Sequence, residues 1–129
     1  MIETLLGALN YKEISSHEKV NRFVLGTNYL SKELNSIMCD ALLETLKLSS
    51  LLAKAYSDTC IDGSNSNYKD NDGLKYECPQ AKEFGFDGKS IMRPNQISIV
   101  NGMFCPSYDE TLLARKYVDT YELYEKVTA

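Results

Sequence analysis

The sequence predicts an α/β fold in which parallel strands alternate with helices. Short apolar runs that end at glycine or aspartate are typical of buried strands. Along the 129 residues they alternate with longer segments whose apolar residues recur at helical spacing. Strict alternation of strand and helix implies parallel strands joined by helical crossovers. This periodicity does not distinguish an open doubly wound sheet from part of a barrel.

Three apolar runs have the length of short buried strands. Residues 23–25 end at Gly26, and residues 59–61 end where Asp62 begins a polar segment. Residues 90–92 form the third run. The stretch from 63 to 73 is rich in Ser, Asn and Asp, which is typical of a loop.

Helices are expected between and after these runs. Residues 41–56 carry Leu and Ala at helical spacing, with Asp40 as a candidate N-cap. Residues 74–84 form a second helix that ends at Gly85, a suitable C-cap. Pro94 is expected to start a short helix.

The last helix has the clearest start signal. Ser107 and Glu110 form a capping-box pattern. One face of the helix carries an apolar stripe that should bury against another surface. The stripe consists of Leu113, Tyr117, Tyr121 and Tyr124, with Leu112 and Val118 beside it.

Composition argues against nucleic-acid and membrane partners. The net charge of −4 and the pI near 5.0 disfavour polyanionic surfaces and leave room only for a local basic patch. No apolar run approaches the ~18 residues that span a bilayer. The first residues lack a basic region, so no signal peptide is predicted and a cytoplasmic location is expected.

The cysteines and the histidine do not form a recognisable ligand set. No two cysteines have zinc-site spacing, so we expect free thiols packed as small hydrophobic side chains in a reducing cytosol. They are Cys39, Cys60, Cys78 and Cys105. His17 lies in a polar stretch and is expected in a solvated loop.

Two short motifs fail as ligand sites. Residues 88–90 read Gly-Lys-Ser, like the end of a phosphate-binding P-loop, but the first glycine of that motif is replaced by Glu83. Residues 70–73 read Asp-Asn-Asp-Gly, like part of a calcium loop. Its first and twelfth positions would be Tyr68 and Pro79, which lack carboxylates.

A longer pattern occupies the last third of the chain. Residues 85–97 read Gly-Phe-Asp-Gly-Lys-Ser-Ile-Met-Arg-Pro-Asn-Gln-Ile, and residues 100–107 read Val-Asn-Gly-Met-Phe-Cys-Pro-Ser. These segments resemble the run with which the citrate lyase β-subunit family, of the HpcH/HpaI aldolase type, closes its barrel. Residues 2–4, 26–30 and 61–62 resemble the ends of that family's strands 5, 6 and 7.

This resemblance implies a partial (β/α)8 barrel. Strands 5–8 would occupy residues 1–106, and a C-terminal helix would occupy residues 107–129. Family members cleave or form a carbon–carbon bond beside a CoA or acyl-carrier thioester with Mg²⁺ present. The citrate lyase β subunit converts a citryl thioester to an acetyl thioester and oxaloacetate. Four parallel strands, each followed by a helix, are expected at residues 1–4, 22–26, 59–62 and 88–92.

The resemblance places one metal ligand in this chain. The family supplies Mg²⁺ with a Glu from strand 5 and an Asp from strand 6, and the matching positions are Glu3 and Tyr29. A neutral phenol is a poor ligand for a hard cation, and Asn28 would point the other way on a strand. We therefore expect weak or lost Mg²⁺ binding, and we assign no catalytic or substrate-binding residue.

A second departure is Arg93, which stands where the family has histidine. In an alternative interpretation both replacements remain functional: Arg93 binds a CoA phosphate and Tyr29 stacks on a ligand.

The family's strands 1–4, which carry its arginine for the substrate carboxylate, have no counterpart here. A complete barrel has about 250 residues, so we expect a truncated, inactive family member. Two alternatives stay open: an active half-enzyme completed by a separate N-terminal half, and a non-catalytic interaction or assembly module. Open strand edges and the apolar stripe predict self-association or a homo-oligomer.

Overall fold

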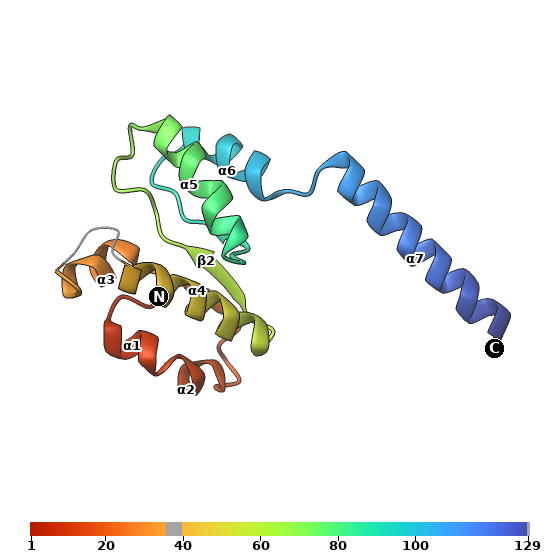
Figure 1. Cartoon of the computed structure of the whole chain (residues 1–129), viewed down its shortest axis with the longest axis horizontal. Coiled ribbons are helices and arrows are strands. Elements are labelled where there is room, and N and C mark those ends of the chain that lie inside the picture. Colours follow the sequence, from red (N-terminus) through yellow and green to blue (C-terminus); the bar gives the residue numbers. More distant parts are fainter. Residues whose placement is uncertain (36–39, 129) are drawn as a thin grey trace.

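The computed structural model describes residues 1–35 and 40–128. Figure 1 shows a body in which helices α1–α6 surround the strands, and a long helix, α7, that projects away from this body. The elements follow in the order α1 (Leu5–Leu9), α2 (Tyr11–Ser15), β1 (Arg22–Val24), α3 (Thr27–Glu33), α4 (Asp40–Ala55), β2 (Thr59–Asp62), α5 (Asn71–Glu83), β3 (Gly88–Lys89), a 3-10 turn η1 (Pro94–Gln96), α6 (Ile97–Phe104) and α7 (Tyr108–Thr128).

The three strands form one parallel sheet in the order β1-β2-β3. The register places Phe23 opposite Cys60 and Asp62 opposite Lys89. Helices connect each strand to the next, as expected for parallel strands. The predicted α/β class and the parallel pairing are confirmed.

The first predicted strand, residues 1–4, is reduced to a single bridge. Ile2 pairs in parallel with Leu25. The Ile2 N–H donates to the carbonyl of Val24 at 2.9 Å, and the Gly26 N–H donates to the carbonyl of Ile2 at 2.7 Å. Ile2 therefore lies beside β1, at the edge of the sheet away from β3.

The last predicted strand, residues 88–92, is also shorter than expected. The sheet ends at Lys89, and one further ladder bond joins the Ser90 N–H to the carbonyl of Asp62 at 2.9 Å. Assigning residues 90–92 as a strand was wrong, because the chain turns there toward η1 at Pro94.

A helix that the sequence did not predict follows β1. Residues 26–30 were expected to end a strand, but α3 begins at Thr27, immediately after Gly26. Asn28 and Tyr29 therefore lie in the first turn of a helix. The fully buried Leu30 anchors this helix to the core.

The ends of α4 and α5 follow their predicted signals only in part, since α5 begins at Asn71, within the segment predicted as a loop. Asp40 is the first residue of α4 rather than its cap. At that position its negative charge interacts favourably with the positive end of the helix dipole. The Asp70 carboxylate caps α5 by accepting the Gly73 N–H at 2.8 Å. Gly85 follows α5 with φ of 91°, a left-handed conformation that glycine tolerates, so the predicted C-terminal signal is confirmed.

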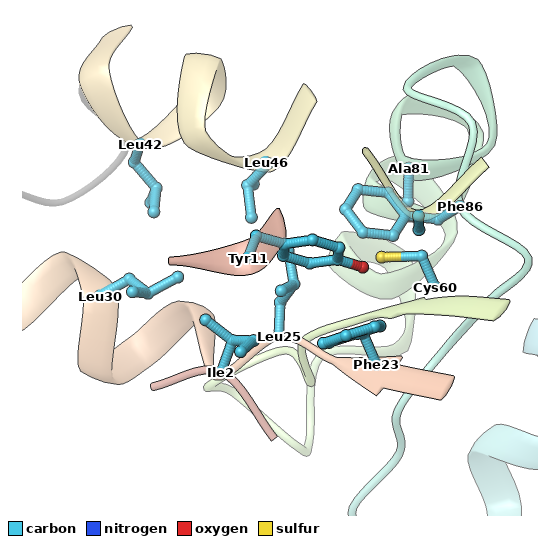
Figure 2. Packing of buried hydrophobic residues seen from close by; sticks show 11 residues of the cluster. Ile2, Tyr11, Phe23, Leu25, Leu30, Leu42, Leu46, Cys60, Ala81 and Phe86 are labelled. Atoms are coloured by element: carbon cyan, nitrogen blue, oxygen red, sulfur yellow. The ribbon is translucent and has the colours of Figure 1, made fainter. Parts of the chain in front are cut away.

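The main core lies between the sheet and the helices that cover it. Figure 2 shows Leu42 and Leu46 of α4 on one side of the cluster and Ile2, Phe23 and Leu25 on the other. The cluster's buried residues are Ile2, Tyr11, Phe23, Leu25, Leu30, Leu42, Leu46, Ala53, Cys60, Ala81 and Phe86. The opposite face of the sheet is less well covered, since Arg22 is exposed while Val24 and Ile61 are only half-buried.

Tyr11 and Cys60 meet inside this core. The Tyr11 ring stacks on Phe23 with centroids 4.1 Å apart, and its hydroxyl is directed toward the Cys60 sulfur (Figure 2). Burial raises the pKa of the Cys60 thiol to about 12, so this thiol is a packing group rather than a nucleophile.

The other cysteines behave differently from one another. Cys78 is fully buried in a second cluster with Leu74 and Val100, between α5 and α6. Cys105 is exposed, so its assignment to the core was wrong, because it follows the end of α6. All three described cysteines are free thiols, and Cys39 lies outside the described residues.

Helix α7 begins with the predicted capping box. The Ser107 N–H donates to Glu110 at 2.7 Å, and the Glu110 N–H donates to the Ser107 hydroxyl at 3.2 Å. Its apolar stripe is at least half exposed at every position, which leaves its burial a prediction. The boundary at residues 106/107 also stays a prediction. Among residues 1–35 and 40–128, no helix is both long and apolar enough to cross a membrane.

Candidate ligand and metal site

A buried ion pair joins the C-terminal ends of two strands. Lys89 Nζ lies 2.6 Å from Asp62 Oδ2, and the two side chains are only 4% and 9% exposed. Glu77 of α5 reaches the same ammonium at 3.1 Å and also accepts a hydrogen bond from Asn65 at 2.9 Å. Burial by itself lowers the pKa of Lys89, but the attraction and hydrogen bond of Asp62 outweigh it and raise that pKa. Lys89 is therefore a buried, paired cation, and the rejection of a P-loop at this segment stays a prediction.

A pocket of about 430 Å³ opens above this pair, between α3–α4 and α5. Its floor is formed by Asp62 and Lys89, and its inner wall includes Leu46 and Phe84. Hydroxyl and amide side chains of α3, among them Asn28, and of the loop after β2 also line the pocket. The pocket is on the helix-covered side of the sheet.

Glu3, the predicted metal ligand, lies elsewhere. It is half-buried beside the end of β1 and does not line the pocket. A Cβ at Gly26 would come within 2.5 Å of Glu3 Cγ, so only glycine lets the two segments approach this closely. The metal position and the pocket are thus separate features.

Tyr29 is three residues beyond Gly26, in the first turn of α3. Its backbone N–H donates to the carbonyl of Gly26 at 2.9 Å, and its side chain is 55% exposed. Lys32 Nζ lies 5.4 Å from the centre of the Tyr29 ring. Glu3 and Tyr29 therefore each lie close to Gly26, which follows β1.

These residues do not fit a complete Mg²⁺ site. Glu3 is one carboxylate, Tyr29 offers a neutral phenol, and the nearby Lys32 adds positive charge where the metal would need anionic oxygen. Within the described part of the chain, no group of three or more His, Cys, Asp or Glu side chains could hold a metal ion. Glu3 as a ligand, and weakened metal binding, stay predictions.

Asn28 faces the pocket rather than the metal position. Its Oδ1 accepts a hydrogen bond from the Ser66 hydroxyl at 2.5 Å, which ties α3 to the loop after β2. The expectation that Asn28 lies on a strand was wrong, because Gly26 ends β1 before this residue.

Arg93 makes a contact that sequence reasoning missed. Its guanidinium lies 4.1 Å from the centre of the Tyr68 ring, which belongs to the loop after β2. The Arg93 N–H also donates to the buried Gln96 side chain at 3.2 Å. The two residues are 25 positions apart, and no sequence pattern links them. His17 is exposed in a loop as predicted, and its Nδ1 accepts the Lys19 N–H at 3.3 Å.

Comparison with known proteins identifies relatives of this chain. No family model matches it. A (3S)-malyl-CoA thioesterase of Cereibacter sphaeroides is 41% identical over 129 residues, which covers 98% of this chain and 45% of the relative. The human mitochondrial citramalyl-CoA lyase is 25% identical over 138 residues, covering 98% and 41%. The citrate lyase subunit beta of Haemophilus influenzae is 30% identical over 67 residues, covering 52% and 23%.

Solved structures share the fold. RipC from Yersinia pestis superposes with a TM-score of 0.80 at 23% identity, covering 85% of this chain and 52% of that one. The citrate lyase beta subunit from M. tuberculosis, complexed with oxaloacetate and magnesium, gives 0.72 at 24% identity, covering 81% and 50%. The same organism's CitE, with magnesium, acetoacetate and coenzyme A, gives 0.73 at 23% identity, covering 92% and 48%.

The chain spans about half the length of the curated relatives it matches over its full extent. Its α/β fold matches the citrate lyase β structures, and its relatives include a thioesterase and two lyases. The predicted resemblance is therefore confirmed: the chain is similar in sequence to the malyl-CoA thioesterase and to the two lyases, and it shares the fold of the citrate lyase β structures.

Proposed function

We propose that this chain forms half of a (β/α)8 barrel, strands 5–8, that binds CoA thioesters of short hydroxy acids, and that taken alone it is catalytically inactive. The observation that carries the proposal is the 41% identity to a (3S)-malyl-CoA thioesterase across 98% of the chain. The names of two of the relatives contain a CoA thioester of a hydroxy acid, and the third relative is named a citrate lyase subunit.

The arrangement of the sheet supports this proposal. Active sites of (β/α)8 barrels lie at the C-terminal ends of the strands, on the loops that follow them. Glu3, Tyr29 and Arg93 all follow the ends of parallel strands or of the bridge at Ile2. Two of these three positions, 29 and 93, carry residues that differ from the family pattern. For this reason we propose that the chain keeps ligand binding but lacks catalytic activity.

The proposed loss of catalysis rests on charge. Cleaving a carbon–carbon bond beside a thioester develops enolate charge that needs a strong electrophile nearby. Glu3 supplies one carboxylate toward a divalent cation, and the residues around Tyr29 do not complete the set. We therefore expect no measurable cleavage or hydrolysis of malyl-CoA by the chain itself.

A second candidate, a half-enzyme completed by another polypeptide, is favoured by one observation. Val24 and Ile61 point to the less covered face of the sheet and are only half-buried. In a closed barrel this face belongs to the packed interior. A complementary half that supplied the remaining strands would cover these side chains.

The test combines binding with turnover. Isothermal titration with CoA and with malyl-CoA measures binding, and chromatography of the thioesters measures turnover with Mg²⁺ present. Binding without turnover supports the proposal, and no binding of either ligand contradicts it. Turnover that appears only after the N-terminal half of the malyl-CoA thioesterase is co-expressed would establish the second candidate.

A further inference from the structure

Two cations converge on one aromatic ring at the C-terminal edge of the sheet. The Arg93 guanidinium lies 4.1 Å from the centre of the Tyr68 ring, and Lys69 Nζ lies 5.8 Å from the same centre. Tyr68 and Lys69 belong to the loop between β2 and α5, whereas Arg93 precedes η1 in the loop after β3. Two loops that are distant in sequence thus assemble one basic, aromatic cluster, which we call the Tyr68 cluster (Tyr68, Lys69 and Arg93).

The positive charges of the Tyr68 cluster are not neutralised within the described structure. Neither Lys69 nor Arg93 has a carboxylate within 4.0 Å among residues 1–35 and 40–128. The nearest acidic neighbour in sequence, Asp70, is turned toward the Gly73 N–H, which it caps at 2.8 Å. Two like charges near one ring repel each other, and an anion bound beside them would lower that repulsion.

The backbone that carries Arg93 is fixed by a buried side chain. The backbone N–H groups of Met92 and Arg93 both donate to Gln96 Oε1, at 3.0 and 3.2 Å, and the Gln96 side chain is buried. The guanidinium lies over the Tyr68 ring in a cation–π contact, and a guanidinium carries five N–H donors in a planar fork. A planar fork of this kind suits the oxygen atoms of a phosphate group.

We infer that the Tyr68 cluster binds a phosphate group, and that in this protein the phosphate is one carried by CoA. The identity of the anion rests on the proposed function, because CoA thioesters carry phosphates on the nucleotide part while their acyl part lies at the reaction centre. A chain with net charge −4 would otherwise repel such a polyanion, so a local basic cluster at the ligand-binding edge is what recognition requires.

The experiment titrates wild type, Arg93→Gln and Lys69→Gln with CoA, dephospho-CoA, pantetheine and pyrophosphate by calorimetry. Arg115→Gln, on the exposed face of α7, is the matched control for loss of one positive charge. We expect each cluster variant to bind CoA about fivefold more weakly. Pantetheine binding should be unchanged, and the control should match wild type. A larger loss for CoA than for dephospho-CoA would identify the 3′-phosphate as the group bound.

Several outcomes separate this inference from the proposed function. CoA binding that is equal in wild type and Arg93→Gln would overturn the inference and leave the proposed function standing. A loss of equal size for CoA and pantetheine would also overturn it, because pantetheine has no phosphate. If wild type binds no CoA, the proposed function fails, and the titration with pyrophosphate decides the inference. Pyrophosphate that binds wild type but not Arg93→Gln supports a phosphate site. If pyrophosphate does not bind wild type, the inference is overturned.

Discussion

Lys89 and Asp62 form a salt bridge of 2.6 Å between the last residues of two neighbouring strands, β3 and β2, and both side chains are buried. The strand register places the two residues directly opposite each other, and Glu77 of α5 completes the group at 3.1 Å. This pair holds the sheet edge to the helix that covers it. The Gly-Lys segment of the family-like motif therefore contributes to the fold by joining β3 to β2 and α5.

Removing the ammonium should destabilise the chain strongly. In Lys89→Met the carboxylates of Asp62 and Glu77 lose their counter-charge, and the free energy of unfolding should fall by about 3–5 kcal/mol. Urea denaturation followed by circular dichroism at pH 7 measures the change. Lys75→Met is the matched control, since Lys75 pairs with Asp72 on the surface, where the two side chains are 55% and 91% exposed. Its effect should stay within about 0.5 kcal/mol, and a similarly small effect of Lys89→Met would contradict the buried pair.

Asp87 should make stability depend on pH in the acid range. Partial burial raises the pKa of its carboxyl, but hydrogen bonds from Lys54 and from the Cys60 N–H outweigh this, and the pKa is lowered overall. The folded state therefore binds fewer protons than the unfolded state. The resulting stability is present above the unfolded value near ~3.9 and is lost as pH falls through the lowered folded value.

Asp87→Asn tests this dependence. The variant should be about 0.5–1 kcal/mol less stable at pH 7, a modest figure because both partners are partly exposed to solvent. The difference should shrink progressively when urea titrations are repeated as pH falls from 4 through the lowered pKa of Asp87, because the wild-type carboxyl then becomes protonated. A difference that stays constant from pH 7 to pH 3 would show that the charge of Asp87 is not responsible.

The less covered face of the sheet should promote self-association. Val24 and Ile61 lie on this face, and the bridge at Ile2 and the two-residue β3 are both edges of the described sheet. Exposed edges with apolar faces pair with other chains. We expect oligomers by size-exclusion chromatography with light scattering, and a smaller oligomeric fraction for the double variant Val24→Thr, Ile61→Thr.

Leu51→Thr, at a 65% exposed position on α4, controls for the loss of any surface hydrophobic group. It should associate like wild type. A stable wild-type monomer with cooperative unfolding would contradict the role of this face.

Local patterns in the sequence were sufficient to predict the longer elements. The helical spacing of leucines predicted α4, and the capping pair Ser107 and Glu110 predicted the start of α7. Gly85 predicted the end of α5 because glycine readily adopts the left-handed conformation found there. Each of these features depends on residues close together in the chain, where periodicity and capping chemistry act directly.

Features that depend on tertiary contacts were not predictable in the same way. Helix α3 has seven residues and little periodicity, and it is held by the burial of Leu30. The stacking of Arg93 on Tyr68 joins two loops whose proximity is set by the parallel register of β2 and β3. The Lys89–Asp62 pair likewise follows from register, which single-sequence patterns do not specify. The resemblance predicted Tyr29 at a strand end rather than in the first turn of α3, and it gave no indication that Lys32 lies beside Tyr29.

Glu3 and Tyr29, near the end of β1, occupy the positions at which the resemblance predicts Mg²⁺ ligands, and the similar citrate lyase β structures contain magnesium. Calorimetric titration with Mg²⁺ and Mn²⁺ of wild type, Tyr29→Asp and the double variant Glu3→Gln, Tyr29→Asp tests this prediction most directly. A second carboxylate beside Glu3 supplies the anionic oxygen that a hard cation requires. We expect weak binding to wild type, an affinity at least about tenfold higher for Tyr29→Asp, and loss of this gain in the double variant. Equal affinities for wild type and Tyr29→Asp would contradict a metal position at this strand end.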